Sequence, residues 1–516
     1  MRQVRLSRLI ATVILLILTL AANAVRVKSH RMSDGKVLHF TRSAQVTRAL
    51  SDPNTTWDAK KTYRLPVILM SFADCDFAED HTLEFYQNMF NKKNFNPGKG
   101  PGCVADYFRD QSSGQFNLQF DVVGPIKLTS NQKAKTDDNY GMSQIRDAIQ
   151  KADSQFNYAN YDWDGDGRAE TVIVIFAGYG GNEDVDEAYG CIWPNTDYLY
   201  MKLDGVTVGG FSASPELWTN NTSCGIGTIC HEFCHVLGLP DMYPVGSSEF
   251  SLLDEWDLMD GGNFSDDGWC PPNLSIHERE YLGWQTPSDL TTTTTITNMP
   301  PFDRKGVAYR IVNDAYPDEY YLLENRQWEG WDMMLPGHGL LITHVDFNGQ
   351  YWKANSVNSS TRHHCLDYFH ADSHDYTYFD AFYGKNQAAY GEDGRNLRMP
   401  HTAYPYVDSL GVSHDALTDE TIPAATLFNR NADGELLMGK PITQIREQGK
   451  FISFKFYASN ADGISSVADD IRPVAYYDLQ GRLLDRETGR QGDKKTGRRG
   501  IIIIKYSDGS TKKIFR

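Results

Sequence analysis

Residues 231–241 read HEFCHVLGLPD, and this stretch carries nearly every part of a hydrolytic metal site. His231 and His235 stand four residues apart, slightly more than one helical turn, so their imidazoles share a helix face and can converge on one metal. Glu232 projects beside them, placed to take a proton from a water molecule that Zn2+ has acidified. The pattern therefore predicts an active-site helix that binds Zn2+ and supports hydrolysis.

The continuation of the motif indicates a third ligand. Gly238 falls where a helix can end in a left-handed turn, and that turn would bring Asp241 back toward the metal as an oxygen ligand. Glu278, in the expected helix within IHEREYLGW (276–284), is the alternative, because a glutamate completes thermolysin-like zinc sites. The spacing favours Asp241. An ordinary amphipathic helix with two histidines is disfavoured, since glycine and aspartate fall where a zinc site needs them.

Further segments carry a family resemblance. The string WDLMDGG (256–262) looks like the methionine turn beneath the zinc of metzincin-type peptidases, with Met259 as a hydrophobic floor. Together with HEFCHVLGLPD it resembles the immune inhibitor A-like metallopeptidases. The other matching segments are LPVILMSFAD (65–74), VADYFRDQSSGQFNLQFDVVGP (104–125), DWDGDGRAETVIVIFAGYG (162–180), PNLS (272–275), LGW (282–284), YYLLENRQWEGWD (320–332) and LPGHGLLITHVD (335–346). The resemblance covers roughly residues 60–455 and implies a secreted zinc endopeptidase.

One position departs from the family pattern. Metzincins often carry a tyrosine two residues after the methionine, where it assists the tetrahedral intermediate, and this chain has Gly261 there. Another hydrogen-bond donor would have to serve, and Tyr243 is the candidate near the motif.

Composition and periodicity divide the chain into several expected domains. With 516 residues and 41% hydrophobic content, the chain can bury more than one sizeable core. Residues 61–290 alternate short β-rich and helical runs, as in an α/β (α+β) catalytic domain, which the resemblance implies to be metzincin-like. Residues 291–460 carry alternating, aromatic-rich strands that predict a β-sandwich-like accessory domain packed against the catalytic domain. Residues 461–516 predict a small β domain of three strands.

Both ends of the chain predict export. Residues 1–24 combine early arginines, an apolar run over 9–22 and the cleavage pattern Ala22-Asn23-Ala24, which together predict a secretory signal peptide. Residues 25–60 are polar and basic and are interpreted as a pro-segment or lead-in. The tail, with YDLQGR (477–482), resembles the sorting domains of the type IX secretion system, which implies outer-membrane secretion machinery as a partner. A plain β accessory module is the alternative for the tail.

A second motif offers ligands for a different ion. Asp162, Asp164 and Asp166, followed by a glycine, repeat the spacing of a calcium loop, with Glu170 at the ninth position. The twelfth position is Ile173, so the bidentate glutamate of an EF-hand is missing. A Ca2+ site and an aspartate-rich surface turn stay open as alternatives.

Charge, cysteines and the remaining histidines narrow the classes of protein. A formal charge of -17 argues against nonspecific nucleic-acid binding. The eight cysteines are too sparse for a disulfide-held scaffold, so the core must hold by packing. His338, His344 and Asp346 show no tight ligand spacing, and structural histidines are favoured over a second metal site there.

Taken together, the sequence predicts a secreted or cell-surface zinc endopeptidase that hydrolyses peptide bonds of protein substrates. His231, His235 and Asp241 would hold Zn2+, and Glu232 would carry the proton from the metal-activated water to the leaving amine. The alternative is a catalytically inactive protease-fold protein that binds partners at the cell surface. The intact Glu232 disfavours it.

Overall fold

The computed structural model describes most of the chain between residues 57 and 460, together with short strands outside that range. The described residues are 29–31, 37–39, 57–133, 140–182, 188, 190–218, 221–245, 252–304, 306–360, 362–374, 399–460, 473–477, 483–484, 501–506 and 511–515. The expected signal peptide lies outside them. Within the expected lead-in, β1 (Ser29–Arg31) and β2 (Val37–His39) pair antiparallel. None of the described helices is both long and apolar enough to span a bilayer.

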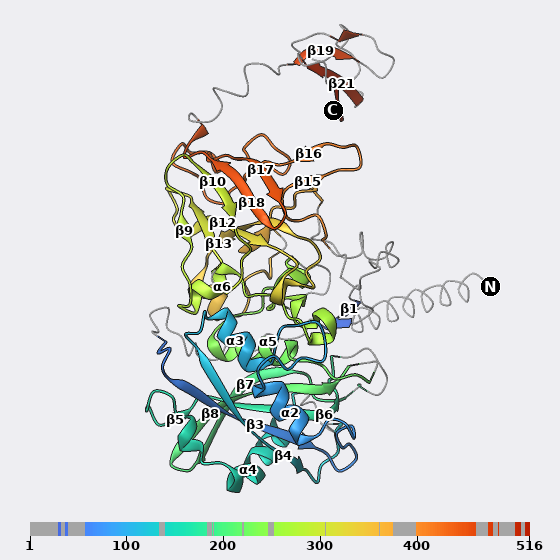
Figure 1. Cartoon of the computed structure of the whole chain (residues 1–516), viewed down its shortest axis with the longest axis vertical. Coiled ribbons are helices and arrows are strands. Elements are labelled where there is room, and N and C mark those ends of the chain that lie inside the picture. Colours follow the sequence, from blue (N-terminus) through green and yellow to red (C-terminus); the bar gives the residue numbers. More distant parts are fainter. Residues whose placement is uncertain are drawn as a thin grey trace, which may run out of the picture.

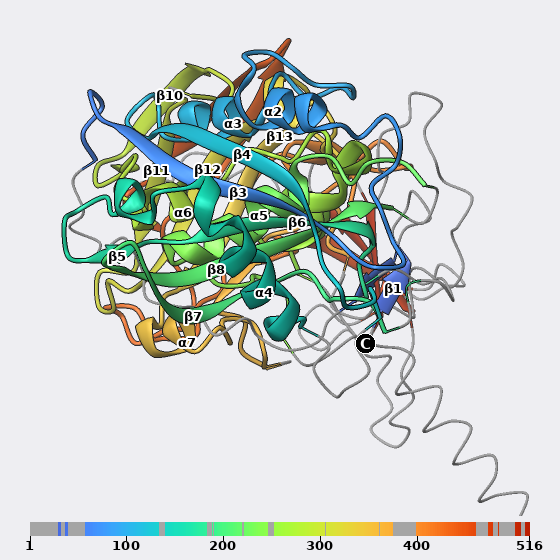
Figure 2. The same cartoon turned by 90° about the horizontal axis from the view of Figure 1, so that it is seen from below.

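A six-stranded, mainly parallel sheet organises the first part of the described chain (Figures 1 and 2). Its parallel strands follow the order β4-β3-β6-β8-β5, and β7 pairs antiparallel with the other side of β8. The strands are β3 (Thr62–Ser71), β4 (Asn117–Lys127), β5 (Arg168–Ala169), β6 (Val172–Tyr179), β7 (Asn195–Leu203) and β8 (Val206–Leu217). Asp204 and Gly205 connect β7 to β8 with φ values of 51° and 82°, as a two-residue type I′ hairpin turn requires.

Helices cover both faces of this sheet, because successive strand residues point to opposite faces. In β3, Val67 and Leu69 join one core with α2, α3 and α5, whereas Ile68 and Met70 join a second core with α4. Figure 1 shows α3 and α5 on one side of the sheet and α4 on the other. The helices are α2 (Leu83–Asn91), α3 (Val104–Gln111), α4 (Met142–Ala152), α5 (Gly227–Leu237) and the 3-10 turns η1 (Asp153–Gln155) and η2 (Tyr158–Tyr161). The predicted mixed α/β region is confirmed.

Two further sheets follow in sequence and share a core of their own. One has the strand order β14-β13-β12-β11-β9, and the other has the order β10-β18-β17. Leu323 and Ile342 of the first sheet meet Ile452 and Phe454 of the second in one hydrophobic cluster. The strands are β9 (Ser288–Asp289), β10 (Thr294–Met299), β11 (Ala308–Val312), β12 (Glu319–Arg326), β13 (Gly339–Asp346), β14 (Leu366–Tyr368), β17 (Ile442–Gln448) and β18 (Phe451–Phe456). These residues form the predicted β-rich region.

Shorter elements complete this part of the chain. They are η4 (Asp254–Trp256), η5 (Gly261–Gly268), α6 (Ile276–Tyr281), η6 (Gly330–Asp332), α7 (Gly349–Lys353), β15 (Tyr406–Val407) and β16 (Ser413–His414). In the tail, β19 (Pro473–Tyr477), β20 (Leu483–Leu484), β21 (Ile501–Tyr506) and β22 (Thr511–Phe515) form an antiparallel sheet in the order β20-β19-β21-β22. The described tail therefore holds four strands where the sequence predicted three.

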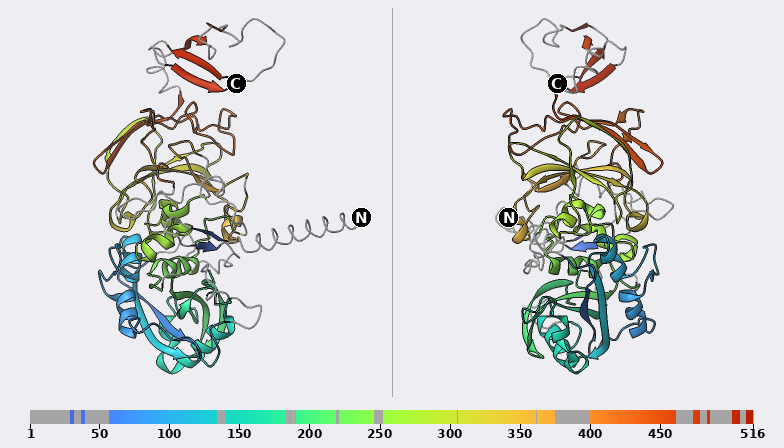
Figure 3. Two further views of the ribbon diagram at one scale, coloured as in Figure 1. Left: turned by 90° about the vertical axis from the view of Figure 1, so that its right-hand side faces the viewer. Right: turned by 60° about the vertical axis from the view of Figure 1, so that its left-hand side comes forward.

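The α/β and β-rich regions share one continuous core. Every residue of β12 and β13 is buried, so both faces of these strands are covered. Leu322 and Leu341, on the face turned away from the β-rich core, belong to the same cluster as Val67 of β3 and Phe233 of α5. Figure 3 shows the β-rich sheets stacked on the α/β region with the segment around α5 between them. The two regions pack together as expected. Residues on both sides of the boundary predicted at 290–291 contribute to this shared core.

All eight cysteines lie among the described residues, and no disulfide joins any two of them there. Seven of them are buried, and Cys230 and Cys234 of α5 belong to the shared core. The described structure is thus held by packing and polar contacts without a disulfide.

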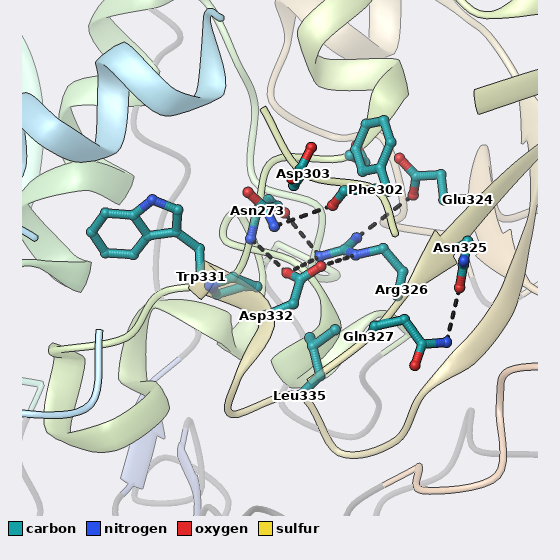
Figure 4. A network of polar contacts seen from close by, with 12 residues as sticks. Asn273, Phe302, Asp303, Glu324, Asn325, Arg326, Gln327, Trp331, Asp332 and Leu335 are labelled. Atoms are coloured by element: carbon teal, nitrogen blue, oxygen red, sulfur yellow. Dashed lines mark hydrogen bonds and ion pairs between the residues drawn. The ribbon is translucent and has the colours of Figure 1, made fainter. Parts of the chain in front are cut away.

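A buried polar network ties the end of β12 to the α/β region (Figure 4). Arg326, only 1% exposed, donates from Nε and Nη2 to the two carboxylate oxygens of Asp332, each at 2.7 Å. Its Nη2 also donates to the backbone oxygen of Asn273 at 3.1 Å. The Asn273 side chain in turn accepts a hydrogen bond from Gln111 of α3 at 3.0 Å. The ion pair between Arg326 and Asp332 is therefore part of the contact between the β-rich and α/β regions.

We expect Arg326→Met to lower the free energy of unfolding by about 3–5 kcal/mol, because it leaves the buried Asp332 carboxylate without its partner. Urea denaturation followed by tryptophan fluorescence measures this loss. The control is Lys450→Met, which removes the exposed ion pair between Lys450 and Glu329 and should cost less than about 1 kcal/mol. Equal losses in the two variants would contradict the assigned role of the network.

Candidate metal centre

Helix α5 is followed by a turn that brings the chain back toward His231 and His235 of the helix. The helix runs from Gly227 to Leu237 and ends at Gly238, whose φ of 101° is in the left-handed region that favours glycine. The N–H of Leu239 closes the helix by donating to the carbonyl of Cys234 at 3.0 Å. The glycine thus adopts the conformation that the sequence predicted, and the chain returns to the histidines at Asp241.

The side chains of His231, His235 and Asp241 converge. Their ligand atoms lie within 4.8 Å of one another, and Asp241 Oδ1 is 3.2 Å from Nε2 of each histidine. The three residues are 5%, 2% and 1% exposed, respectively. The structure therefore brings together the three side chains that the sequence predicted as metal ligands.

Backbone carbonyls orient both imidazoles. His231 Nδ1 lies 2.9 Å from the carbonyl oxygen of Leu258, and His235 Nδ1 lies 2.8 Å from that of Leu239. A carbonyl oxygen only accepts hydrogen bonds, so in the neutral ring each Nδ1 carries the proton and each Nε2 presents a lone pair. Such outer partners are typical of metal-bound histidines.

The converging atoms fit a divalent cation. Within the described part of the chain, no hydrogen bond satisfies the buried Asp241 Oδ1. Burial lowers the pKa of His235, yet the Asp241 carboxylate outweighs burial and raises that pKa to about 9, so the group of three favours a positive charge. Two imidazole nitrogens and one carboxylate oxygen are a ligand set that Zn2+ takes in catalytic sites, where one position stays open.

Glu232 lies beside the histidines and is held by a residue from another element. Its Oε2 accepts a hydrogen bond from Thr196 Oγ1 at 2.9 Å, and the same hydroxyl lies 2.7 Å from the backbone oxygen of Glu232. Thr196 belongs to β7, the antiparallel edge strand. Burial raises the pKa of Glu232, the direction that suits a general base working near neutral pH. Sequence reasoning missed Thr196, because a single threonine in a strand carries no local signal.

The predicted methionine turn lies directly against the candidate ligands. Leu258 provides the carbonyl that accepts from His231, and the neighbouring Met259 is fully buried. The backbone oxygen of Met259 accepts from the N–H of Met242 at 2.8 Å, next to the candidate ligand Asp241. Asp257 Oδ1 closes the turn by accepting from the N–H of Met259 at 2.8 Å. The turn thus supports both His231 and the segment that carries Asp241.

Glu278 is not among the converging side chains. Its Oε2 accepts hydrogen bonds from the N–H and hydroxyl of Ser275 at 2.7 and 2.9 Å, which forms a capping box at the start of α6. Burial and the nearby Asp257 carboxylate raise its pKa well above the ordinary value. The contacts therefore favour Asp241 over Glu278 as the third ligand.

The aspartate loop between η2 and β5 is exposed and satisfies its own carboxylates. Ligand oxygens within 4.8 Å of one another come from Asp162, Asp164 and Asp166. Asp162 accepts from the N–H groups of Gly165 and Gly167 at 2.8 and 2.9 Å. Glu170 does not join them: both of its oxygens accept from the N–H of Trp163, and burial raises its pKa to about 8. Glu170 is therefore not part of the aspartate group, and the contacts give Ca2+ no support.

Histidines of the β-rich region pair with single carboxylates. The pairs are His338 with Glu447 at 2.8 Å, His344 with Glu319 at 2.8 Å and His363 with Asp346 at 2.6 Å. Among the described residues, only the two groups discussed above bring three metal-binding side chains together. These contacts agree with the prediction of structural histidines.

Comparison with known proteins places the site in a family context. Residues 68–287 match the catalytic domain of the immune inhibitor A peptidase M6 family. The chain is also similar to immune inhibitor A of Bacillus thuringiensis subsp. alesti, with 27% identity over 203 residues. This similarity covers 35% of the chain and 28% of that protein, so the chain spans less than a third of its relative. The range 68–287 contains α5, the turn with Asp241 and the methionine turn.

The choice of third ligand can be checked by metal content. Asp241→Asn removes a charged ligand oxygen and should weaken zinc binding by more than the roughly 10–100-fold typical of outer-sphere substitutions. Glu278→Gln should keep one zinc per chain. Elemental analysis after dialysis against a weak chelator measures both. Loss of zinc from Glu278→Gln alone would contradict the assignment.

Proposed function

We propose that the protein is a secreted, metzincin-like zinc endopeptidase, and the match of residues 68–287 to the catalytic domain of the immune inhibitor A peptidase M6 family, a family of zinc metalloendopeptidases, supports this proposal. The observation that carries the proposal is the convergence of His231, His235 and Asp241 at a buried point. Three protein ligands leave a coordination position for solvent, which distinguishes a catalytic zinc site from a structural one with four.

Each residue around this point has a chemical role in the proposal. When bound, Zn2+ supplies Lewis-acid activation of the water that attacks the peptide carbonyl. Glu232 accepts a proton from that water and passes it to the leaving amine. Thr196 holds one oxygen of the Glu232 carboxylate, and the other oxygen would take the proton.

Tyr243 is proposed as the donor that replaces the tyrosine missing at Gly261. Its ring lies parallel to that of His231, with centroids 6.5 Å apart, and it is half-buried next to the ligands. A phenolic hydroxyl at this place can donate a hydrogen bond to the negative charge that develops on the substrate carbonyl oxygen.

We also propose the export route and the division of the chain. Members of this family are typically secreted, which supports residues 1–24 as a signal peptide and 25–60 as a pro-segment or lead-in. Residues 61–290 would be the catalytic domain, 291–460 an accessory domain and 461–516 a sorting domain that meets the type IX secretion machinery. Detection of the mature protein outside the cell, and its retention when 461–516 are deleted, would test this route.

The general base can be tested by Glu232→Gln. The amide keeps the shape of the side chain but cannot take a proton, so casein cleavage should fall by on the order of 10²–10⁴-fold while zinc content stays unchanged. Casein digestion by the purified secreted protein, with and without a chelator, provides the reference. A wild-type protein that binds zinc and digests no casein would favour the inactive binding protein, and undiminished cleavage by the variant would refute the assigned base.

Thr196→Val should separate positioning of the base from binding of substrate. Loss of a hydrogen bond to a charged group costs about 1.5–3 kcal/mol, so we expect kcat to fall roughly 10-fold or more with little change in KM. Thr196→Ser keeps the hydroxyl and should retain most of the activity. Steady-state kinetics on a peptide substrate measure both, and equal losses in the two variants would argue against a role for the hydroxyl.

A further inference from the structure

A segment of the β-rich region is hydrogen-bonded to the turn that carries Asp241. Trp352 of α7 donates from Nε1 to the carbonyl of Gly238 at 3.0 Å. Asn358 donates from Nδ2 to the carbonyl of Met242 at 2.8 Å. These contacts lie on either side of Asp241 along the chain. The donors belong to residues 352–358, which lie outside the range 68–287 that matches the family's catalytic domain.

Between these two contacts, Asn355 binds Asp241 at two points. Its Oδ1 accepts from the N–H of Asp241 at 2.6 Å, and its Nδ2 donates to Asp241 Oδ2 at 2.6 Å. Both residues are buried, with Asn355 0% exposed. Because Oδ2 is engaged by the amide, Oδ1 is the carboxylate oxygen left to face the two histidines, and it is the atom 3.2 Å from both Nε2 atoms.

The segment that presents Asn355 is itself anchored. The Trp352 ring packs against His277 and Tyr281 of α6, with centroids 5.1 and 4.6 Å apart. Asn358 exchanges hydrogen bonds with Leu366 of β14, accepting at 3.1 Å and donating at 2.8 Å. Asn355 has a φ of 51°, a left-handed conformation that asparagine tolerates better than most residues. The segment that presents the amide is therefore held by contacts that do not involve the three candidate ligands.

We propose that Asn355 is the positioning residue for the third metal ligand, and that the metal centre is built by both regions of the chain. The α/β region supplies the ligands, and the β-rich region sets the orientation of Asp241. This inference rests on the proposed function in one respect, namely that the three converging side chains bind zinc. Outer-sphere partners of this kind change metal affinity by roughly 10–100-fold when they are removed.

The test uses the full chain carrying Glu232→Gln, which prevents self-cleavage, as the parent. Asn355→Gly removes the amide and suits the left-handed backbone, so it isolates the two contacts with Asp241. The matched control is Asn325→Ala: Asn325 is equally buried and donates to two backbone carbonyls, those of Met299 and Lys450, away from the metal ligands. Zinc affinity is measured by competition with a chromophoric chelator, and ligand geometry by the visible spectrum of the Co2+-loaded protein.

We expect Asn355→Gly to bind zinc roughly 10–100-fold more weakly than the parent and to shift the Co2+ bands. The control should lose stability and keep its metal affinity within about threefold, because its hydrogen bonds do not reach a ligand. Parent-like zinc affinity with an unchanged Co2+ spectrum in Asn355→Gly would overturn the inference.

A second variant decides the matter if Asn355→Gly does not fold. Trp352→Phe retains an aromatic ring and loses only the donor to Gly238, so zinc affinity should fall roughly 3–10-fold. An unchanged affinity in that variant would also count against the inference. The two levels of proposal fail differently: a parent that binds no zinc removes the proposed function, whereas a zinc-binding parent with an unaffected Asn355 variant removes only the role of Asn355.

Discussion

The carboxylate of Asp241 is buried against two imidazole nitrogens, and this buried charge is the constraint around which the centre is arranged. Removing a carboxylate from water costs several kcal/mol unless a counter-charge and hydrogen bonds compensate. One oxygen receives the Asn355 amide, and the other faces the two Nε2 atoms. The arrangement leaves one place for positive charge, at the point where a metal ion would sit.

Several separate elements of the fold donate or accept hydrogen bonds at this centre. The methionine turn supplies the carbonyl that orients His231 and is hydrogen-bonded to the residue after Asp241. The β7 edge strand supplies Thr196 to Glu232. The β-rich region supplies Asn355 through a segment anchored on α6 and β14. Strands β12 and β13 are buried on both faces. The shared core therefore packs the two regions that supply Thr196 and Asn355 against each other.

Local signals were reliable where the chemistry is local. The histidine spacing, the left-handed glycine and the aspartate ten residues after the first histidine all lie within one helix and its terminal turn, so sequence spacing translates into geometry. Glu170 and Glu278 do not belong to the converging groups, because a side chain's direction depends on its neighbours in space. Glu170 turns inward to Trp163 instead of joining the aspartates. Glu278 caps α6, and the string Ser275-Ile276-His277-Glu278 is a capping-box signature that could have assigned it from sequence.

The sequence by itself determined the helix, its end at Gly238, the three candidate ligands and the α/β and β-rich character of the two regions. These follow from periodicity and short spacings, which act within one or two elements. Only the tertiary structure decided which partners hold Glu232 and the candidate ligand Asp241. Thr196 lies 36 residues from Glu232 in the chain, and Asn355 lies 114 residues from Asp241. Such pairs form when remote segments pack side by side, and a lone threonine or asparagine carries no spacing that foretells its partner.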